Sequence, residues 1–193
     1  MATLFVDKLD PQSGTSLEIG SSGDTITIPS GATITNNGTQ TGFGGANTPA
    51  FQAYASSDQS QTNDTFTKIQ CNTEDFDVGG NYDHSTNYRF TPTTSGKYCI
   101  YGQAHCNAGS GNLTRLTVAI YKNGTDVAKT DYFLKTSSQT WTELTGVTQT
   151  IEAANGSSDY FELYARLRTY TGGGVDIEGG AGKSFFGAYK IIE

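Results

Sequence analysis

Along most of the chain, apolar and polar residues alternate one by one, which is the pattern of a β-strand with one buried face. Residues 160–168 show it most clearly, with Phe161, Leu163, Ala165 and Leu167 at every second position. The same alternation places Tyr98, Ile100, Gly102, Ala104 and Cys106 on one face of a strand, and Leu116, Val118 and Ile120 on one face of the next. No segment repeats apolar residues every 3.6 positions. We therefore predict an all-β domain over residues 46–193, built as a sandwich or jelly roll.

A tight turn is predicted at Asn123-Gly124, because this dipeptide between apolar runs is the strongest short-range signal of a hairpin. Asn123-Gly124-Thr125 also matches the N-glycosylation acceptor pattern. The first ten residues lack a basic segment followed by an apolar one, so no signal peptide is expected. We accordingly interpret the acceptor pattern as turn chemistry.

Residues 1–45 differ from the rest because their alternating runs, such as TSLEIG and DTITIPSG, stop after a few residues at Gly, Ser or Asn. Strands this short are marginal alone. We predict an arm of short strands that becomes stable when three copies wind together and bury their isoleucines. The alternative is an arm without fixed structure.

Composition and charge narrow the function classes. The hydrophobic fraction of 35% predicts a thin core that burial between subunits would support. The net charge of −7 and the lack of a basic run argue against nucleic acid as a partner. No apolar run is long enough to cross a bilayer, so membrane insertion is not expected. The odd set of Cys71, Cys99 and Cys106 favours free, buried thiols.

Candidate chemistry is sparse, and we do not expect an enzyme. The two histidines, His84 and His105, accompany no nucleophile elbow and no recognised zinc spacing. Residues 73–84 gather carboxylates around two glycines, and calcium prefers carboxylate oxygens on flexible loops. A calcium loop of Asp75, Asp77 and Asp83 is therefore one hypothesis, and a solvated acidic loop is the other; no other cofactor is expected.

Aromatic residues on the polar side of strands predict a subunit interface, since several of them on one sheet face exceed what a solvated face needs. Tyr101 and Tyr164 lead this set, because each is expected opposite the core. The predicted trimer interface consists of Tyr101, Tyr160, Tyr164, Phe186 and Tyr189.

Four segments in order resemble the globular head of complement component 1q and its relatives. They are FTKIQCNTEDFDVGGNYDHSTNYRFTPTTSGKYCIYGQAH, LTVAIYKNGTDVA, SSDYFELYARL and SFFGAYKI. The resemblance spans about residues 50–193. It implies a ten-stranded jelly roll that trimerises like the tumour-necrosis-factor superfamily, and it implies binding or assembly rather than catalysis. The chain lacks the collagen-like stalk of that family.

In the arm, the segment VDKLDPQSGTSLEIGSSGDTITIPSGATITNNGTQTGFG, residues 6–44, resembles N-terminal segments of structural proteins of tailed bacteriophages. This resemblance implies a homotrimeric capsid decoration or cement protein on the virion surface, assembled in the host cytoplasm, with the major capsid protein or another virion protein as partner. The alternatives are a short tail fibre or spike whose knob binds host surface glycan, and a secreted complement-like binding module. The residues expected to anchor the arm to the capsid are Leu4, Phe5, Val6, Leu17, Ile19, Ile26, Ile28 and Ile34.

Overall fold

The structure is a computed structural model that describes residues 7–38, 47–109, 112–134, 142–170, 172 and 174–191. The chain divides into two units, Met1–Phe43 and Gly44–Glu193. We treat each unit by itself.

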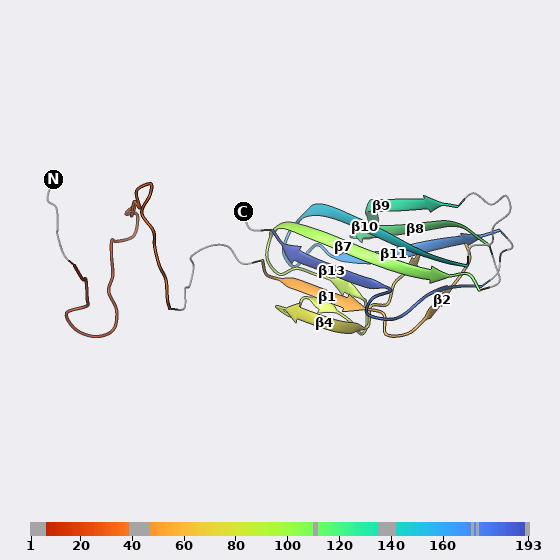
Figure 1. The fold of residues 1–193 in the computed structure, drawn as a ribbon, viewed down its shortest axis with the longest axis horizontal. Coiled ribbons are helices and arrows are strands. Elements are labelled where there is room, and N and C mark those ends of the chain that lie inside the picture. The colour runs from red at the N-terminus through yellow and green to blue at the C-terminus, as the bar shows by residue number, and fades with distance from the viewer. Residues whose placement is uncertain are drawn as a thin grey trace. The chain divides into compact units, whose positions relative to one another are not determined.

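The first unit contains turns and bends but, between residues 7 and 38, no strand (Figure 1). One turn is closed twice at Asp24, whose N–H donates to the Ser21 carbonyl at 2.9 Å and whose carboxylate accepts from the Ser21 N–H at 2.7 Å. The predicted strands require three copies wound together, because such short segments are marginal alone. A single chain does not test them, so they stay a prediction.

The apolar side chains of the arm remain in solvent. The exposed fractions of Ile19 and Ile26 are 61% and 60%, and Leu17, Ile28 and Ile34 are also exposed. Leu4, Phe5 and Val6 lie outside the described residues.

The second unit is a sandwich of two antiparallel sheets (Figure 1). The first, called the β7 sheet, has the strand order β2-β12-β7-β13-β1-β4, and β10 also pairs with β7. The second, called the β8 sheet, has the strand order β5-β6-β11-β8-β9, and β3 also pairs with β11. The strands are β1 Ala50–Tyr54, β2 Gln59–Gln61, β3 Thr67–Lys68, β4 Thr73–Val78, β5 Tyr82–Asp83, β6 Arg89–Phe90, β7 Gly96–Asn107, β8 Leu113–Lys122, β9 Thr125–Phe133, β10 Glu143–Ala154, β11 Phe161–Thr169, β12 Val175–Ile177 and β13 Phe185–Lys190.

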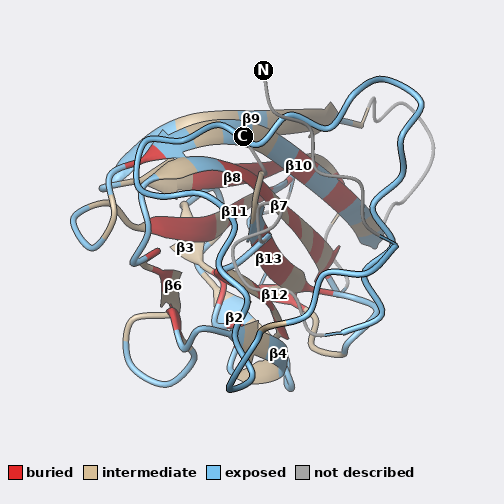
Figure 2. Cartoon of the chain, turned by 90° about the vertical axis from the view of Figure 1, so that its left-hand side faces the viewer, coloured by how far each residue is buried: buried red, intermediate tan, exposed pale blue. Residues whose placement is uncertain are grey.

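The core lies between the sheets, where Figure 2 shows the buried bands of β7, β8, β11 and β13. The alternation predicted for β7, β8 and β11 is confirmed: Ile100, Ile120 and Leu167 are fully buried. An aromatic cluster fills one part of this core. The ring of Phe51 lies 4.4 Å from that of Tyr82 and 4.8 Å from that of Phe90. No helix in the described part of the chain is long and apolar enough to cross a bilayer.

The hairpin predicted at Asn123-Gly124 is confirmed. Lys122 pairs with Thr125, and both turn residues have positive φ, 51° and 81°, as a two-residue hairpin turn of the favoured type requires. The Asn123 side chain also holds the turn in place, because its oxygen accepts from the Tyr160 N–H at 2.9 Å and its amide donates to Asp159 at 2.8 Å. The turn is thereby fastened to the segment that precedes β11.

Candidate functional site

The outer face of the β7 sheet, which points away from the core, carries an apolar row across five strands. The registers align Val78 with Ala50, Ala50 with Tyr189, Tyr189 with Cys99, and Cys99 with Ile151. Residues directly paired in an antiparallel sheet point to the same side. We call these five residues the apolar row.

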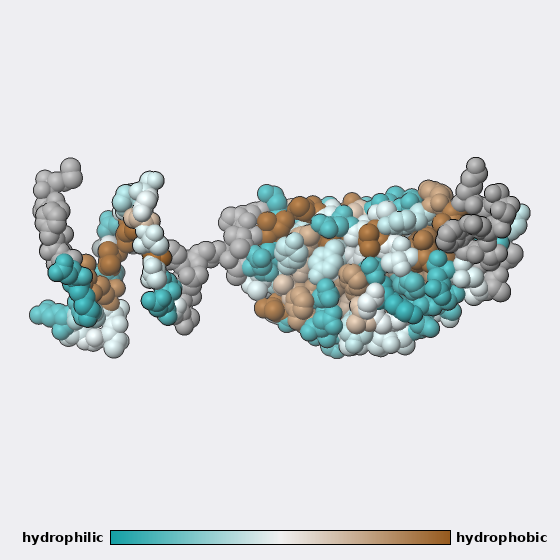
Figure 3. Space-filling model, in the orientation of Figure 1, coloured by the Kyte–Doolittle hydropathy of each residue, from teal (hydrophilic) through white to brown (hydrophobic). Residues whose placement is uncertain are grey.

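Much of this row is exposed in the single chain. The exposed fractions are 59% for Ile151, 49% for Val78 and 41% for Tyr189. Phe76 and Val147, on the same outer face, are exposed as well. Figure 3 shows this face, with brown apolar patches where β4 ends and along β10. Contiguous apolar surface of this kind marks an interaction site more often than scattered single residues do.

Tyr101 supports the middle of this face from within the chain. Its ring lies across Gly187, where an added Cβ would come within 2.4 Å of the ring. Its hydroxyl donates to Gln52 at 3.0 Å, and Gln52 in turn donates to Asp75 at 2.9 Å. Beside β10 the surface is hollowed by about 450 Å³, with Tyr101, Val147 and Phe185 among the lining residues. Thr130 and Tyr132 of β9 also line this hollow, so it lies where β10 approaches β9, at the edge of the face that carries the apolar row.

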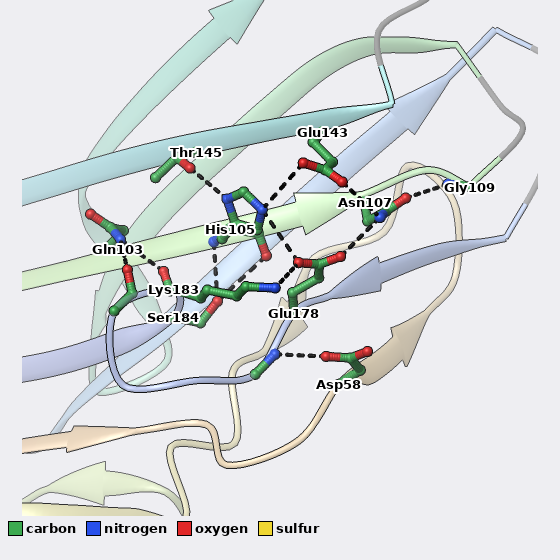
Figure 4. A network of polar contacts seen from close by, with 12 residues as sticks. Asp58, Gln103, His105, Asn107, Gly109, Glu143, Thr145, Glu178, Lys183 and Ser184 are labelled. Atoms are coloured by element: carbon green, nitrogen blue, oxygen red, sulfur yellow. Dashed lines mark hydrogen bonds and ion pairs between the residues drawn. The ribbon is translucent and has the colours of Figure 1, made fainter.

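The other end of the same face is polar (Figure 4). His105 contacts Thr145 at 2.6 Å through Nδ1, and its Nε2 lies 3.3 Å from a carboxylate oxygen of Glu178. Glu178 also accepts hydrogen bonds from Lys183 and, at 2.8 Å, from Asn107. These donors, Lys183 first, hold the pKa of Glu178 below its ordinary value. This polar cluster forms a charged border next to the apolar surface, the arrangement of an interface with an apolar centre and a polar rim.

The outer face of the β8 sheet has a different character, because several of its charges pair closely with one another. Lys68 lies 2.5 Å from the almost fully buried Glu162, and Arg115 lies 2.7 Å from Asp131. The Arg166 guanidinium stacks on Phe66 at 4.7 Å. Where charges are satisfied within the chain in this way, the face needs no partner to cover it; Arg168, at the end of β11, is the exposed and more loosely paired charge of this face.

The structure separates the predicted interface residues into three groups. Tyr101 and Tyr189 lie on the outer face of the β7 sheet. Tyr164 lies on the outer face of the β8 sheet, where its ring is 4.3 Å from that of Tyr121, and Tyr160 precedes β11 with the Arg89 guanidinium 4.7 Å above its ring. The expectation that Tyr101 and Tyr164 share a sheet face is therefore wrong, because β7 and β11 belong to different sheets.

Phe186 is a second correction. It is 1% exposed and packs against Phe51 at 5.2 Å inside the core, so it cannot contact another subunit. Phe185, its neighbour, points outward instead. Val147 and Ile151 were not among the predicted interface residues, although alternation along residues 143–154 places both on one face of β10.

The predicted calcium residues do not form one loop. Asp75 and Asp77 lie in β4, whereas Asp83 ends β5. Asp77 accepts from the backbone N–H groups of Asn81 and Tyr82, and Asp83 caps the turn after it, accepting from the N–H of Thr86 at 2.9 Å. These bonds, the Thr86 one first, lower the pKa of Asp83. In the described ranges no group of three or more His, Cys, Asp or Glu could hold a metal ion.

The three cysteines are free and buried. Cys106 faces the core and Cys99 faces the outer side of β7, as their spacing in one strand predicts. Burial raises the pKa of the Cys71 thiol to about 12 and also raises that of Cys106. Such thiols are poor nucleophiles at neutral pH.

The fold defined by these sheets is an all-β jelly roll of the kind found in tumour necrosis factor and complement 1q. Eiger TNF from S. frugiperda matches with a TM-score of 0.51 at 12% identity, over 74% of this chain and 91% of that one. Murine APRIL matches with a TM-score of 0.50 at 9% identity, over 74% and 99%. The globular domain of zebrafish complement 1qA protein gives 0.48 at 11% identity, over 74% and 97%.

At these identities the likeness shows the fold alone. No family model matches the chain, and no curated protein does either. The predicted jelly roll is therefore confirmed by structure, whereas the function requires arguments from this chain's own surfaces.

Proposed function

We propose that this protein is a homotrimeric surface protein of a tailed-bacteriophage virion, a capsid decoration or cement protein without catalytic activity. In this proposal residues 46–193 form an exterior knob, and residues 1–45 attach it to the major capsid protein or another virion protein. The observation that carries the self-association is the apolar row on the β7 sheet. Its partner is a second copy of the chain, which in a closed trimer meets the row with a different part of its own surface.

Two arguments favour a second copy over an unrelated partner. The row is flanked by the polar cluster around His105 and Glu178, where acidic and basic side chains stand together, so this face offers charges of both signs to a neighbouring copy of the chain. The jelly rolls that the sequence resembles also trimerise. Burial between copies would further supply the apolar contacts that a chain with a 35% hydrophobic fraction has in short supply.

The arm supports the attachment part of the proposal. Leu17, Ile19, Ile26, Ile28 and Ile34 are all exposed in the single chain. Apolar side chains at that spacing, on a segment without strands of its own, are suited to become ordered on binding, and the ordering cost is then met by the partner surface. The predicted site of virion attachment is therefore the arm rather than the knob.

The experiment is native mass spectrometry of the full chain and of a chain lacking residues 1–45, together with quantification of the protein in purified particles. We expect trimers from both chains, attachment to particles only with the arm, and hundreds of copies per particle. A monomer at micromolar concentration would refute the assembly. A few to tens of copies would favour the short tail fibre, and absence from particles would refute the virion role.

A further inference from the structure

A second hollow, of about 340 Å³, lies at the end of the β8 sheet where β9 ends and β11 ends, opposite the end where β1 begins (Figure 1). Its walls come from the first residues of β8 and the last residues of β9 and β11. The lining residues are Thr114, Arg115, Phe133, Arg168, Thr169 and Tyr170. The volume falls within the range of about 300–1,000 Å³ that is usual for small-molecule sites.

The charge arrangement in this hollow points to an anion. Arg115 and Arg168 are direct cross-strand partners of β8 and β11, and like charges placed directly opposite each other are unfavourable. Arg115 is neutralised, since its Nε and Nη2 donate to Asp131 at 2.9 and 2.7 Å. Arg168 is paired more loosely: its side chain is 60% exposed, and its ion-pair partner Asp64 lies 3.8 Å from Nε, beyond hydrogen-bond distance, and is shared with Arg166. The Arg168 guanidinium therefore has donors to offer in a protein whose net charge is −7.

Aromatic rings stand at the same place. Phe133 and Tyr170 are 70% and 77% exposed, more than any other large hydrophobic residue in the described ranges. Arg115 holds Phe133 through its guanidinium, 4.8 Å from the ring centroid. Two exposed rings beside an exposed, loosely paired guanidinium offer one ligand both an apolar surface and a charged group.

From these observations we propose that this hollow binds a carboxylate-bearing sugar. The Arg168 guanidinium receives the carboxylate through paired N–H···O bonds, a geometry that suits arginine. The apolar face of the pyranose ring packs on Tyr170 and Phe133. Free phosphate would use the arginine but leave the rings without a role, and a nucleic-acid strand needs a run of basic residues that this chain lacks.

The site is independent of the proposed assembly. Its residues lie on β8, β9 and β11, whereas the apolar row lies on β4, β1, β13, β7 and β10. Sugar binding and trimerisation can therefore fail separately, and a loss of one in a variant does not imply a loss of the other.

The test is saturation-transfer NMR and calorimetry on the full chain with galacturonic acid, N-acetylneuraminic acid, galactose and inorganic phosphate as probes. Galacturonic acid and galactose differ only in the carboxylate, so they isolate the role of Arg168. We expect millimolar binding of at least one acidic sugar and at least about tenfold weaker binding of galactose. Raising the salt concentration should weaken the binding of the acidic sugar, because salt screens the charge of the exposed Arg168.

Two variants and a control locate the binding. Arg168→Gln should weaken the binding of the acidic sugar at least about tenfold, so that the variant no longer prefers this sugar over galactose. Tyr170→Ala should weaken the binding of both the acidic sugar and galactose. The control, Lys129→Gln, removes one exposed positive charge elsewhere on the same sheet and should bind like the wild type. Thermal unfolding checks that each variant is folded.

Four results would overturn the proposal. They are the absence of any response to acidic sugars up to about 20 mM, equal affinity for galactose and galacturonic acid, wild-type binding by the Arg168→Gln variant, and phosphate binding as tight as that of the acidic sugar. The last would reassign the hollow to a simple anion.

Discussion

Replacing Ile151 by aspartate separates assembly from folding. Ile151 is 59% exposed and ends the apolar row on β10. Burying a whole isoleucine is worth about 1.5–3 kcal/mol, so covering the exposed part between copies would contribute about 1–2 kcal/mol per chain. An aspartate loses this contribution and adds the cost of placing a polar, charged group against an apolar surface, about 2 kcal/mol or more. Together these effects weaken association by a factor of about 10²–10³ per chain.

The fold itself should change little. Surface substitutions usually alter the free energy of unfolding by about 0.5 kcal/mol, and the poorer strand propensity of aspartate adds up to about 1 kcal/mol. Sedimentation velocity over a range of micromolar concentrations measures the assembly, and circular dichroism melting measures the fold. We expect Ile151→Asp to be a folded monomer.

The matched control is Phe133→Asp. Phe133 is 70% exposed, also lies in a strand, and is far from the row. This variant should remain a trimer and lose sugar binding instead. If Ile151→Asp assembles as well as the wild type, or if Phe133→Asp dissociates in its place, the β7 face is not the interface and the argument from the apolar row fails.

Three further predictions follow from the geometry. Gly102→Ala should destabilise the knob by about 1–3 kcal/mol in urea unfolding, because the new Cβ would come within 2.4 Å of the Leu163 side chain. Unchanged stability would mean that the Leu163 side chain moves aside without cost. Hydrogen bonds from Asn155 and Asn123 lower the pKa of Asp159 to about 2. The ionised carboxylate therefore stabilises the fold fully above the ordinary pKa near 4, and this stabilisation is lost as the pH falls toward 2. Asp159→Asn should reduce the drop in melting temperature between about pH 4 and pH 2, and a drop identical to that of the wild type would contradict this role of Asp159. Cys71 and Cys106 should resist thiol reagents at neutral pH until the protein is unfolded, and rapid labelling in native buffer would refute their burial.

The periodic signals in the sequence predicted the long strands correctly. Alternation over 160–168 identified the core side of β11, and the Asn-Gly pair identified the β8–β9 hairpin. Both depend on local chemistry, since a strand with one buried face and a turn with two positive φ angles each restrict nearby residues. Alternation does not tell which sheet a strand joins. Tyr101 and Tyr164 were therefore placed together, although the pairing of β7 and β11 with different partners puts them on opposite sheets.

Other errors arose where local pattern carries little information. The run that contains Phe185 and Phe186 is apolar on both faces, so alternation could not decide which ring enters the core. Asp77 and Asp83 are near each other in sequence and were assigned to one metal loop, but each is used to close its own turn. The arm isoleucines alternate like strand residues, but the predicted pairing is between copies of the chain, so a single chain leaves it a prediction. In each case the deciding interaction is long-range.

The two outer faces of the sandwich explain why one chain would serve both assembly and recognition. On the β8 face the ion pairs, such as Lys68 with Glu162, are completed within the chain, so solvent can cover that face without loss. On the β7 face the aligned Val78, Tyr189 and Ile151 are 49%, 41% and 59% exposed, and contact with water is unfavourable for apolar surface. Association through the β7 face would leave the β8 face outermost. That places the hollow around Arg168 where a soluble sugar or a surface glycan can reach it, and it predicts that acidic-sugar binding survives in the Ile151→Asp monomer. If binding disappears in that folded monomer, the hollow depends on assembly, and the separation of the two surfaces is wrong.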